Sequence, residues 1–223
     1  MKKLVIVGTS DLGQIAYEYF TYDSDYDVVA FAVNREFIQE DKLYGLPIVA
    51  LEDLADLYPN DEFCVHVALT YQGVNTVRRR LFDELKAQDY TFANYISSKA
   101  FVWRNVELGE NVFIFENNVV QPFCKVGNCV VLWSGNHIGH HSEIKDNCFI
   151  SSHVALSGRC VVGENCFIGV NSSIGDNIKL APFGWFGQGC VVTKDTIENR
   201  IYTGVPAKPR DVTTTDFFGL KNV

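Results

Sequence analysis

Large apolar residues recur at every sixth position through the second half of the chain. The run begins at Val102 and ends at Val192, and all sixteen positions carry Val, Ile, Leu or Phe. Glycine follows the apolar residue in seven of these units, while helix signals vanish from about residue 100 onward. A period of six is typical of a solenoid in which each unit forms one short strand and a bend.

Three such units close a triangular coil of 18 residues, so sixteen units predict a little over five coils of a left-handed parallel β-helix. The residue two positions before each apolar residue is small or of modest size, and five of the seven cysteines occupy this column. We interpret these cysteines as small buried packing residues. An odd number of cysteines with no CxxC pair argues against a disulfide framework and against a zinc ribbon.

The first 97 residues follow a different pattern. Strand-like segments over 3–7, 28–33 and 63–69 alternate with helical patterns over 14–20 and 74–87, which predicts a small parallel α/β sheet. The turn from Gly8 to Gly13 lies between the first strand and the first helix, as in a Rossmann arrangement. We therefore expect a Rossmann-like domain over 1–97 and an all-β left-handed helix with a C-terminal tail over 98–223.

The charge balance limits the partners of the protein. With 19 Lys and Arg against 27 Asp and Glu, the formal net charge of -8 disfavours nucleic acid and anionic membrane surfaces. No apolar stretch is long enough for a transmembrane helix, and the apolar run near the start is too short for a signal peptide, so we expect a cytoplasmic protein. The run Arg78–Arg80 is interpreted as the solvated face of a helix.

Four of the five histidines lie close together, at His137, His140, His141 and His153, and none falls in an inward column. An imidazole on the outside of a rigid coil suits general-base catalysis, because its ordinary pKa is near neutrality and its backbone is held in place. Gly158 follows His140 by 18 residues, so stacking would bring its N–H beside that ring, where it could bind an oxyanion.

A zinc site is the competing interpretation of this cluster, since the four histidines could supply three nitrogen ligands. Some hexapeptide-repeat proteins are zinc carbonic anhydrases, but their ligands lie on successive coils. His137, His140 and His141 lie in one corner instead, which favours acid–base chemistry over a metal.

The whole chain resembles the sialic acid O-acetyltransferase (NeuD)-like sugar acyltransferases, which include bacillosamine and perosamine N-acetyltransferases. Besides the sixteen hexads, the motifs that carry the resemblance are Val5-Ile6-Val7-Gly8, Tyr44-Gly45-Leu46-Pro47-Ile48-Val49, Ile138-Gly139-His140 and Tyr202-Thr203-Gly204-Val205-Pro206-Ala207-Lys208. The hexads alone specify only a broad acyltransferase superfamily, whereas their combination with the α/β domain and the closing motif is much more specific.

The resemblance implies a homotrimer with active sites between neighbouring prisms, acetyl-CoA along the coils, a nucleotide-linked amino sugar on the front domain, and no metal. His140 matches the base that takes a proton from the attacking amine, with the oxyanion on Gly158 and no acyl-enzyme intermediate. The residues that match the coenzyme A region are Gly187, Gly189, Pro206 and Lys208, and Gly158 is expected to contact the cofactor as well. The residues expected to contact the nucleotide sugar are Gly8, Thr9, Ser10, Asn34, Arg35 and Thr70. Asn34 stands where a carboxylate often contacts the ribose or the base, so the nucleotide stays open.

Two departures from the family pattern concern the site. The family usually follows its histidine with Asp or Glu, which orients the imidazole, but here His141 follows, and Glu143 and Asp146 are the nearby carboxylates. We take Glu143 as the candidate. Many members also carry a second histidine at the position of Phe149.

The resulting hypothesis is acetyl-CoA-dependent N-acetylation of a nucleotide-linked amino-deoxysugar for lipopolysaccharide or other surface glycan synthesis. The alternatives are O-acetylation of a sugar hydroxyl, as on sialic acid, a zinc hydratase, and a non-catalytic trimer that binds nucleotide sugars.

Overall fold

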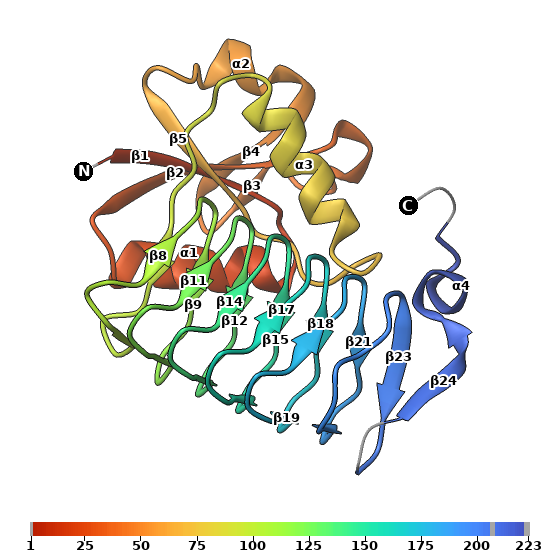
Figure 1. Ribbon diagram of the computed structural model, residues 1–223. Coiled ribbons are helices and arrows are strands. Elements are labelled where there is room, and N and C mark those ends of the chain that lie inside the picture. Colours follow the sequence, from red (N-terminus) through yellow and green to blue (C-terminus); the bar gives the residue numbers. More distant parts are fainter. Residues whose placement is uncertain (1, 206–207, 221–223) are drawn as a thin grey trace. The chain divides into compact units, whose positions relative to one another are not determined.

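The computed structural model describes residues 2–205 and 208–220, and it divides into two compact units (Figure 1). The first unit comprises the chain up to Thr70 together with Arg78–Tyr95. The second comprises Tyr71–Val77 and the chain from Ile96 onward. A single boundary after residue 97 does not anticipate that Tyr71–Val77 packs with the second unit.

The first unit contains a five-stranded sheet in the order β3-β4-β2-β1-β5, in which β1 runs parallel to β2 and β5 and β2 runs parallel to β4. The strands are β1 (Lys2–Val7), β2 (Tyr26–Val33), β3 (Lys42–Leu43), β4 (Leu46–Ala50) and β5 (Phe63–Val67). The helices are α1 (Asp11–Tyr22), η1 (Arg35–Phe37), η2 (Leu51–Asp53), α2 (Leu54–Leu57) and α3 (Thr76–Lys86). This confirms the Rossmann-like α/β prediction. The antiparallel β3–β4 hairpin was not predicted.

His66 on β5 is buried in the core of this unit. Its Nδ1 lies 2.9 Å from the Ala93 carbonyl oxygen, so the neutral ring donates a hydrogen bond there. The pKa of His66 is lowered to about 4, chiefly because the ring is buried. The hydrogen bond to Ala93 acts against this lowering, and the positive charge of Arg78 adds to it.

The depressed pKa of His66 predicts that the protein loses stability on mild acidification. Below the ordinary histidine pKa of about 6.5, the unfolded chain binds a proton that the folded ring does not accept. The free energy of unfolding should therefore fall by ~3 kcal/mol between about pH 6.5 and 4 through this residue alone. Urea denaturation across this range, compared between the wild type and His66→Gln, isolates the effect. Parallel profiles for the two proteins would contradict it.

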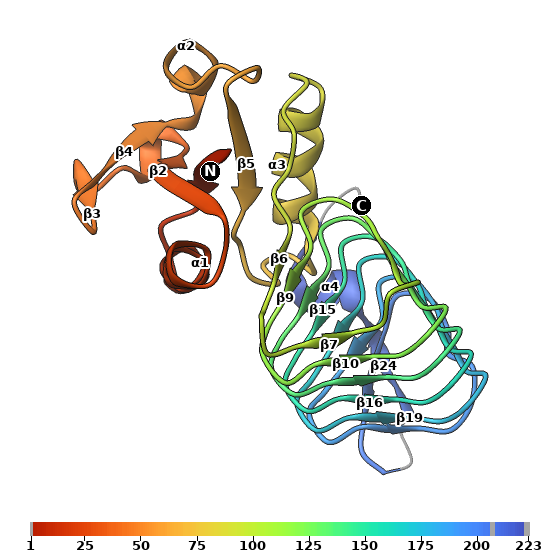
Figure 2. The ribbon, with the colours of Figure 1, turned by 90° about the vertical axis from the view of Figure 1, so that its left-hand side faces the viewer.

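The second unit is a triangular solenoid whose three sides are parallel sheets (Figures 1 and 2). One side contains β7 (Phe101–Val102), β10 (Val119–Val120), β13 (His137–Ile138), β16 (Ala155–Leu156), β19 (Ser173–Ile174) and β22 (Val191–Val192). The next contains β8 (Glu107–Leu108), β11 (Lys125–Val126), β14 (Glu143–Ile144), β17 (Val161–Val162) and β20 (Lys179–Leu180). The third contains β6 (Tyr95–Ile96), β9 (Phe113–Ile114), β12 (Val131–Leu132), β15 (Phe149–Ile150), β18 (Phe167–Ile168), β21 (Trp185–Phe186), β23 (Arg200–Thr203) and the antiparallel β24 (Lys208–Thr213). Helix α4 (Thr214–Phe218) follows.

From β7 to β22, each strand of the solenoid pairs with the strand one coil away, at a spacing of 18 residues. Val119, for example, pairs with Phe101 and with His137. This confirms the prediction that three six-residue units form one coil of 18 residues. No helix within residues 2–205 and 208–220 is long and apolar enough to cross a membrane.

The two inward columns fill the solenoid, and the cysteine column has a second purpose. All seven cysteines are free thiols and buried. Cys148 Sγ donates to the Gly163 carbonyl at 3.1 Å, Cys160 Sγ to the Gly175 carbonyl at 3.0 Å, and Ser142 Oγ to the Ser157 carbonyl at 3.1 Å. A small donor in this column thus gives a hydrogen bond to a backbone carbonyl at a bend of the next coil. The prediction of packing cysteines is confirmed, and burial raises the pKa of Cys190 to about 11.

The corners of the solenoid share one backbone conformation. Every sixth residue from Asn111 to Gly189 has a positive φ, and eight of these fourteen residues are Asn or Gly. Asn and Gly adopt the left-handed region most readily, so this column explains the many asparagines of the second half. His141 and His153 occupy the same column, with φ of 59° and 57°.

Candidate active site

His140 lies at the corner that follows β13, with an exposed side chain. Its backbone N–H donates to Gln121 Oε1 at 2.9 Å, and its carbonyl accepts from the Arg159 N–H at 2.9 Å. The backbone on both sides of the peptide is therefore fixed by neighbouring coils. The structure places this imidazole outside the apolar interior, as the register of the hexads predicted.

Gly158 lies against the His140 ring on the next coil. A Cβ atom on Gly158 would lie 2.8 Å from Cε1 and 2.9 Å from Nε2 of His140, so only a glycine leaves room for the ring in this position. The expectation of a free N–H at Gly158 is wrong for this structure, because that N–H donates to Asp176 Oδ1 at 3.0 Å.

The physical reason is that Asp176 occupies the same corner position one coil beyond Gly158, and its short side chain reaches back to the preceding amide. Asn128 and Asp146 do the same at another corner. Asn128 Oδ1 accepts from the Glu110 N–H at 2.9 Å, and Asp146 Oδ1 accepts from the Asn128 N–H at 2.8 Å.

The partner of the His140 ring is His141. The two Nδ1 atoms lie 3.1 Å apart, and the rings are perpendicular at 88° with centroids 5.3 Å apart. Glu143 was expected in this role, but within residues 2–205 and 208–220 it makes no hydrogen bond or ion pair with His140. The reason is that Glu143 lies on β14, beyond the corner, in register with Lys125 and Val161.

His141 stacks on Phe123, its neighbour in the same column one coil earlier. The Phe123 ring stacks on it with centroids 4.6 Å apart and planes at 27°. Desolvation lowers the pKa of His141 first, and the positive charges of Arg159 and His140 lower it further.

The other two histidines of the cluster do not join this pair in a metal site. His137 lies on β13 and His153 at the corner after β15. Among the described residues, no group of three or more His, Cys, Asp or Glu side chains converges as metal ligands.

Phe149, which stands where many of the similar acyltransferases carry a second histidine, belongs to an aromatic cluster. Phe149 is buried between Trp133 and Phe167, with ring centroids 5.7 and 5.9 Å away. Tyr71 from the segment Tyr71–Val77 also contacts Phe149, at 5.1 Å.

The residues expected to contact coenzyme A lie near the C-terminal coils. Gly187 is half-buried, Gly189 is exposed with a φ of 65°, and Lys208 is exposed at the start of β24. Pro206 lies outside the described residues. Their role stays a prediction.

The turn after β1 has the close approach that its glycines predict. Gly8 has a φ of 128°, and a Cβ there would lie 2.7 Å from the Ala68 carbonyl oxygen. Gly13 on α1 lies directly against the Gly8 carbonyl. Thr9 follows Gly8 and Ser10 is the N-cap residue of α1, so the amide end of this helix opens beside the turn.

Thr70 ends the segment that follows β5, and a buried arginine holds its backbone. Arg78 Nη1 donates to the Leu69 and Thr70 carbonyls, at 3.0 Å each. Interpreting all three arginines as a solvated face was wrong for Arg78, which is fully buried. Arg79 and Arg80 form exposed ion pairs with Asp83 and Glu84, as expected.

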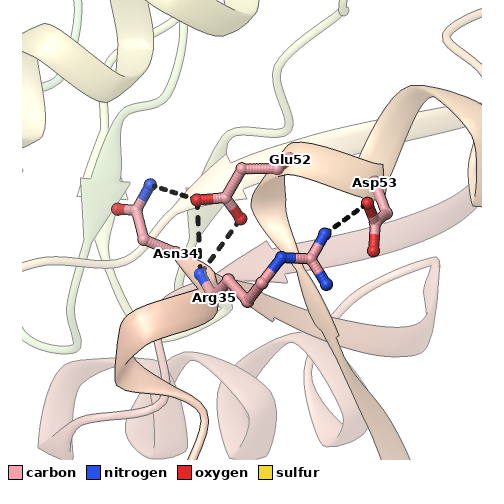
Figure 3. Close-up of polar contacts among 4 residues, drawn as sticks. All are labelled: Asn34, Arg35, Glu52 and Asp53. Carbon is pink, nitrogen blue, oxygen red and sulfur yellow. Dashed lines mark hydrogen bonds and ion pairs between the residues drawn. The ribbon is translucent and has the colours of Figure 1, made fainter.

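Asn34 and Arg35 follow β2 and are joined to a carboxylate that the sequence did not reveal (Figure 3). The Glu52 carboxylate accepts hydrogen bonds from Asn34 Nδ2 at 3.3 Å and from the Arg35 N–H at 3.0 Å. The pKa of Glu52 is lowered chiefly by a hydrogen bond from its own backbone N–H, and the bonds from Arg35 and Asn34 lower it further. Arg35 Nη2 lies 2.6 Å from Asp53 Oδ1. In the sequence, Asn34 occupies the position after β2 where a carboxylate is common. In the structure, Glu52 from η2 brings a carboxylate to that position.

The fold defined by these units is a Rossmann-like α/β part and a left-handed parallel β-helix, which solved sugar acetyltransferases share. A variant of perosamine N-acetyltransferase from Caulobacter crescentus, in complex with CoA and GDP-perosamine, matches with a TM-score of 0.83 and 21% identity, over 94% of this chain and 97% of that chain. The acetyltransferase domain of PglB from Neisseria gonorrhoeae, in complex with acetyl coenzyme A, matches with a TM-score of 0.84 and 21% identity, over 94% and 99% of the two chains.

The similarity in sequence covers less of the chain than the similarity in structure. No family model matches the chain. The UDP-3-O-acylglucosamine N-acyltransferase of Campylobacter lari is 26% identical over 129 residues, or 50% of this chain. The chain spans only 40% of the length of that curated relative.

Proposed function

We propose that the protein is an N-acetyltransferase that moves an acetyl group from acetyl-CoA to the amine of a nucleotide-linked amino-deoxysugar. The observation that carries this proposal is the exposed His140 ring, paired through Nδ1 and laid against Gly158 on a rigid coil. The likeness of almost the whole chain to a perosamine N-acetyltransferase and to the PglB acetyltransferase domain supports it.

In the proposed reaction, the sugar amine attacks the thioester carbonyl and His140 Nε2 takes the proton that the amine loses. The carbon–sulfur bond then breaks and coenzyme A leaves as the thiolate or thiol, so no cysteine carries the acetyl group. The buried thiols of the solenoid are consistent with direct transfer. The Gly158 N–H becomes a donor for the oxyanion only when the Asp176 carboxylate turns away from it.

The substrates are assigned to two regions of the chain. Gly187, Gly189, Pro206 and Lys208 would contact coenzyme A, the exposed Lys208 facing its phosphates. For the nucleotide sugar, the proposed contacts are Gly8, Thr9, Ser10, Asn34, Arg35 and Thr70. The helix N-terminus beside Gly8 favours a diphosphate, because its backbone N–H groups and its dipole attract anions.

The proposal includes a homotrimer that acts in the cytoplasm during surface glycan synthesis. Light scattering of the purified protein tests the trimer, since a monomeric protein with full activity would exclude a site shared between subunits.

An assay of coenzyme A release with UDP-, dTDP- and GDP-linked amino sugars tests the function. We expect release with at least one of them, together with an N-acetylated product by mass spectrometry. Acetylation of a hydroxyl instead would support the O-acetyltransferase alternative. No thioester consumption with any sugar would contradict the enzyme and favour a nucleotide-sugar-binding trimer, whereas a stoichiometric metal in the purified protein would favour the zinc hydratase.

A further inference from the structure

The corner of the solenoid that carries His140 differs from the other two corners in the residue types at its left-handed positions. Its left-handed positions on successive coils are Phe123, His141 and Arg159, with φ of 65°, 59° and 59°, and then Asn177. Most of the corresponding positions at other corners are Asn or Gly, which adopt this conformation with less strain. Three consecutive coils here use large side chains instead, which indicates that these side chains serve a purpose besides turning the chain.

The geometry of the pair suggests what that purpose is. With Nδ1 atoms 3.1 Å apart and both rings neutral, a single proton lies between them, on one nitrogen or the other. If His140 is to accept a proton at Nε2, its own proton must already be on Nδ1. His141 Nδ1 then accepts the bond, and the proton of His141 is on its outer nitrogen, Nε2.

We propose, on the basis of the function proposed above, that His141 is a positioning residue whose neutral imidazole accepts the His140 Nδ1–H and so holds His140 in the tautomer that can act as a base. This places a neutral acceptor where a carboxylate would commonly stand. When His140 becomes an imidazolium during transfer, the same bond becomes charge-assisted.

The surroundings of His141 keep it in the accepting state. Phe123 covers its ring from the preceding coil, Arg159 follows it in the next coil, and His140 lies beside it. Desolvation lowers the pKa of His141, and the positive charges of Arg159 and His140 lower it further, which favours the neutral ring. Asp176, which reaches the Gly158 amide against the His140 ring, is the one carboxylate that the described contacts bring to this corner.

A neutral acceptor has a consequence for the pH dependence of the reaction. A carboxylate would favour protonated His140 and so hold the base inactive up to a higher pH. With His141 in place, the enzyme should keep its activity further into the acidic range. Replacing His141 with Asp should therefore move the acidic limb of the kcat profile upward, by about one pH unit.

The test compares three variants in the coenzyme A release assay. His141→Ala removes the acceptor and should lower kcat by about 10- to 100-fold with little change in KM for acetyl-CoA. His141→Asp restores an acceptor, and most of kcat should return with the shifted limb. His153→Ala is the matched control, because His153 is an exposed histidine at an equivalent left-handed corner. It should keep kcat within about twofold of the wild type. Unchanged kcat in His141→Ala, or an Asp variant as slow as the Ala variant, would overturn the proposal.

A second measurement needs no substrate and separates this inference from the proposed function. In protein labelled with ¹⁵N-histidine, long-range ¹⁵N–¹H spectra should show His140 as the Nδ1–H tautomer in the wild type and a mixture of tautomers in His141→Ala. If the wild type acetylates no sugar but shows this difference, the function fails and the positioning role stands. If the wild type is active but its His140 tautomer does not depend on His141, only this inference fails.

Discussion

Replacing His140 with alanine is expected to lower kcat for acetyl transfer by about a hundredfold or more. The ring is exposed and lies outside the apolar interior, so its removal leaves no cavity in the solenoid. The backbone bonds to Gln121 and Arg159 do not involve the side chain and should remain. Initial rates of coenzyme A release at saturating acetyl-CoA, together with thermal melting of the two proteins, measure the effect.

His137→Ala is the control for this substitution, because His137 is also exposed and belongs to the same coil. It should keep both its melting temperature and its kcat near those of the wild type. Comparable activity in the two variants would show that His140 is not the base.

Replacing Gly158 with alanine is the second large effect that we expect, and it acts through His140 rather than through the fold. The new methyl group would lie 2.8 Å from Cε1 of His140, which is too close, so the ring must move. A displacement of about 1 Å can cost on the order of a hundredfold in rate. Because the ring is a mobile side chain on the surface, we expect kcat to fall by tenfold or more with little loss of stability.

Gly175→Ala provides the comparison, since a methyl group there has its nearest neighbour at 3.6 Å, an ordinary contact. It should retain activity. If Gly158→Ala retained full kcat as well, the ring position in the structure would not be the one that the reaction uses.

The solenoid could be predicted from the sequence because its register requires an apolar residue at every sixth position. One slip would expose Ile138 and its counterparts, so every unit must carry an apolar residue at the same place. The two inward columns and the outward position of His140 follow directly from this repeat. The Rossmann-like turn was predictable for a similar reason, since Gly8 and Gly13 approach each other too closely for a side chain.

The contacts that complete the site were not predictable, because they join residues whose order in the sequence carries no such signal. Glu52 meets Asn34 only through the packing of neighbouring strand ends, and Asp176 reaches Gly158 only through the coil stacking. The His140–His141 pair forms at a corner where the backbone of His141 is left-handed. A signal was available here, since the asparagine column marks the corners and His141 interrupts it.

The burial of Arg78 could not be predicted from the sequence for a different reason. A run of three arginines on a helix has the pattern of a solvated surface, and two of the three obey it. The first, Arg78, is buried, and its guanidinium donates hydrogen bonds to the backbone carbonyls of Leu69 and Thr70.

The central claim is that His140 accepts the proton of an amine that attacks acetyl-CoA. A crystal structure of the His140→Ala protein with coenzyme A and the amino sugar that it acetylates tests this most directly. With the wild-type ring superposed, we predict that the sugar nitrogen lies within about 3.2 Å of Nε2, on the side of the thiol of coenzyme A. A sugar amine bound on a side of the solenoid remote from this corner would contradict the account.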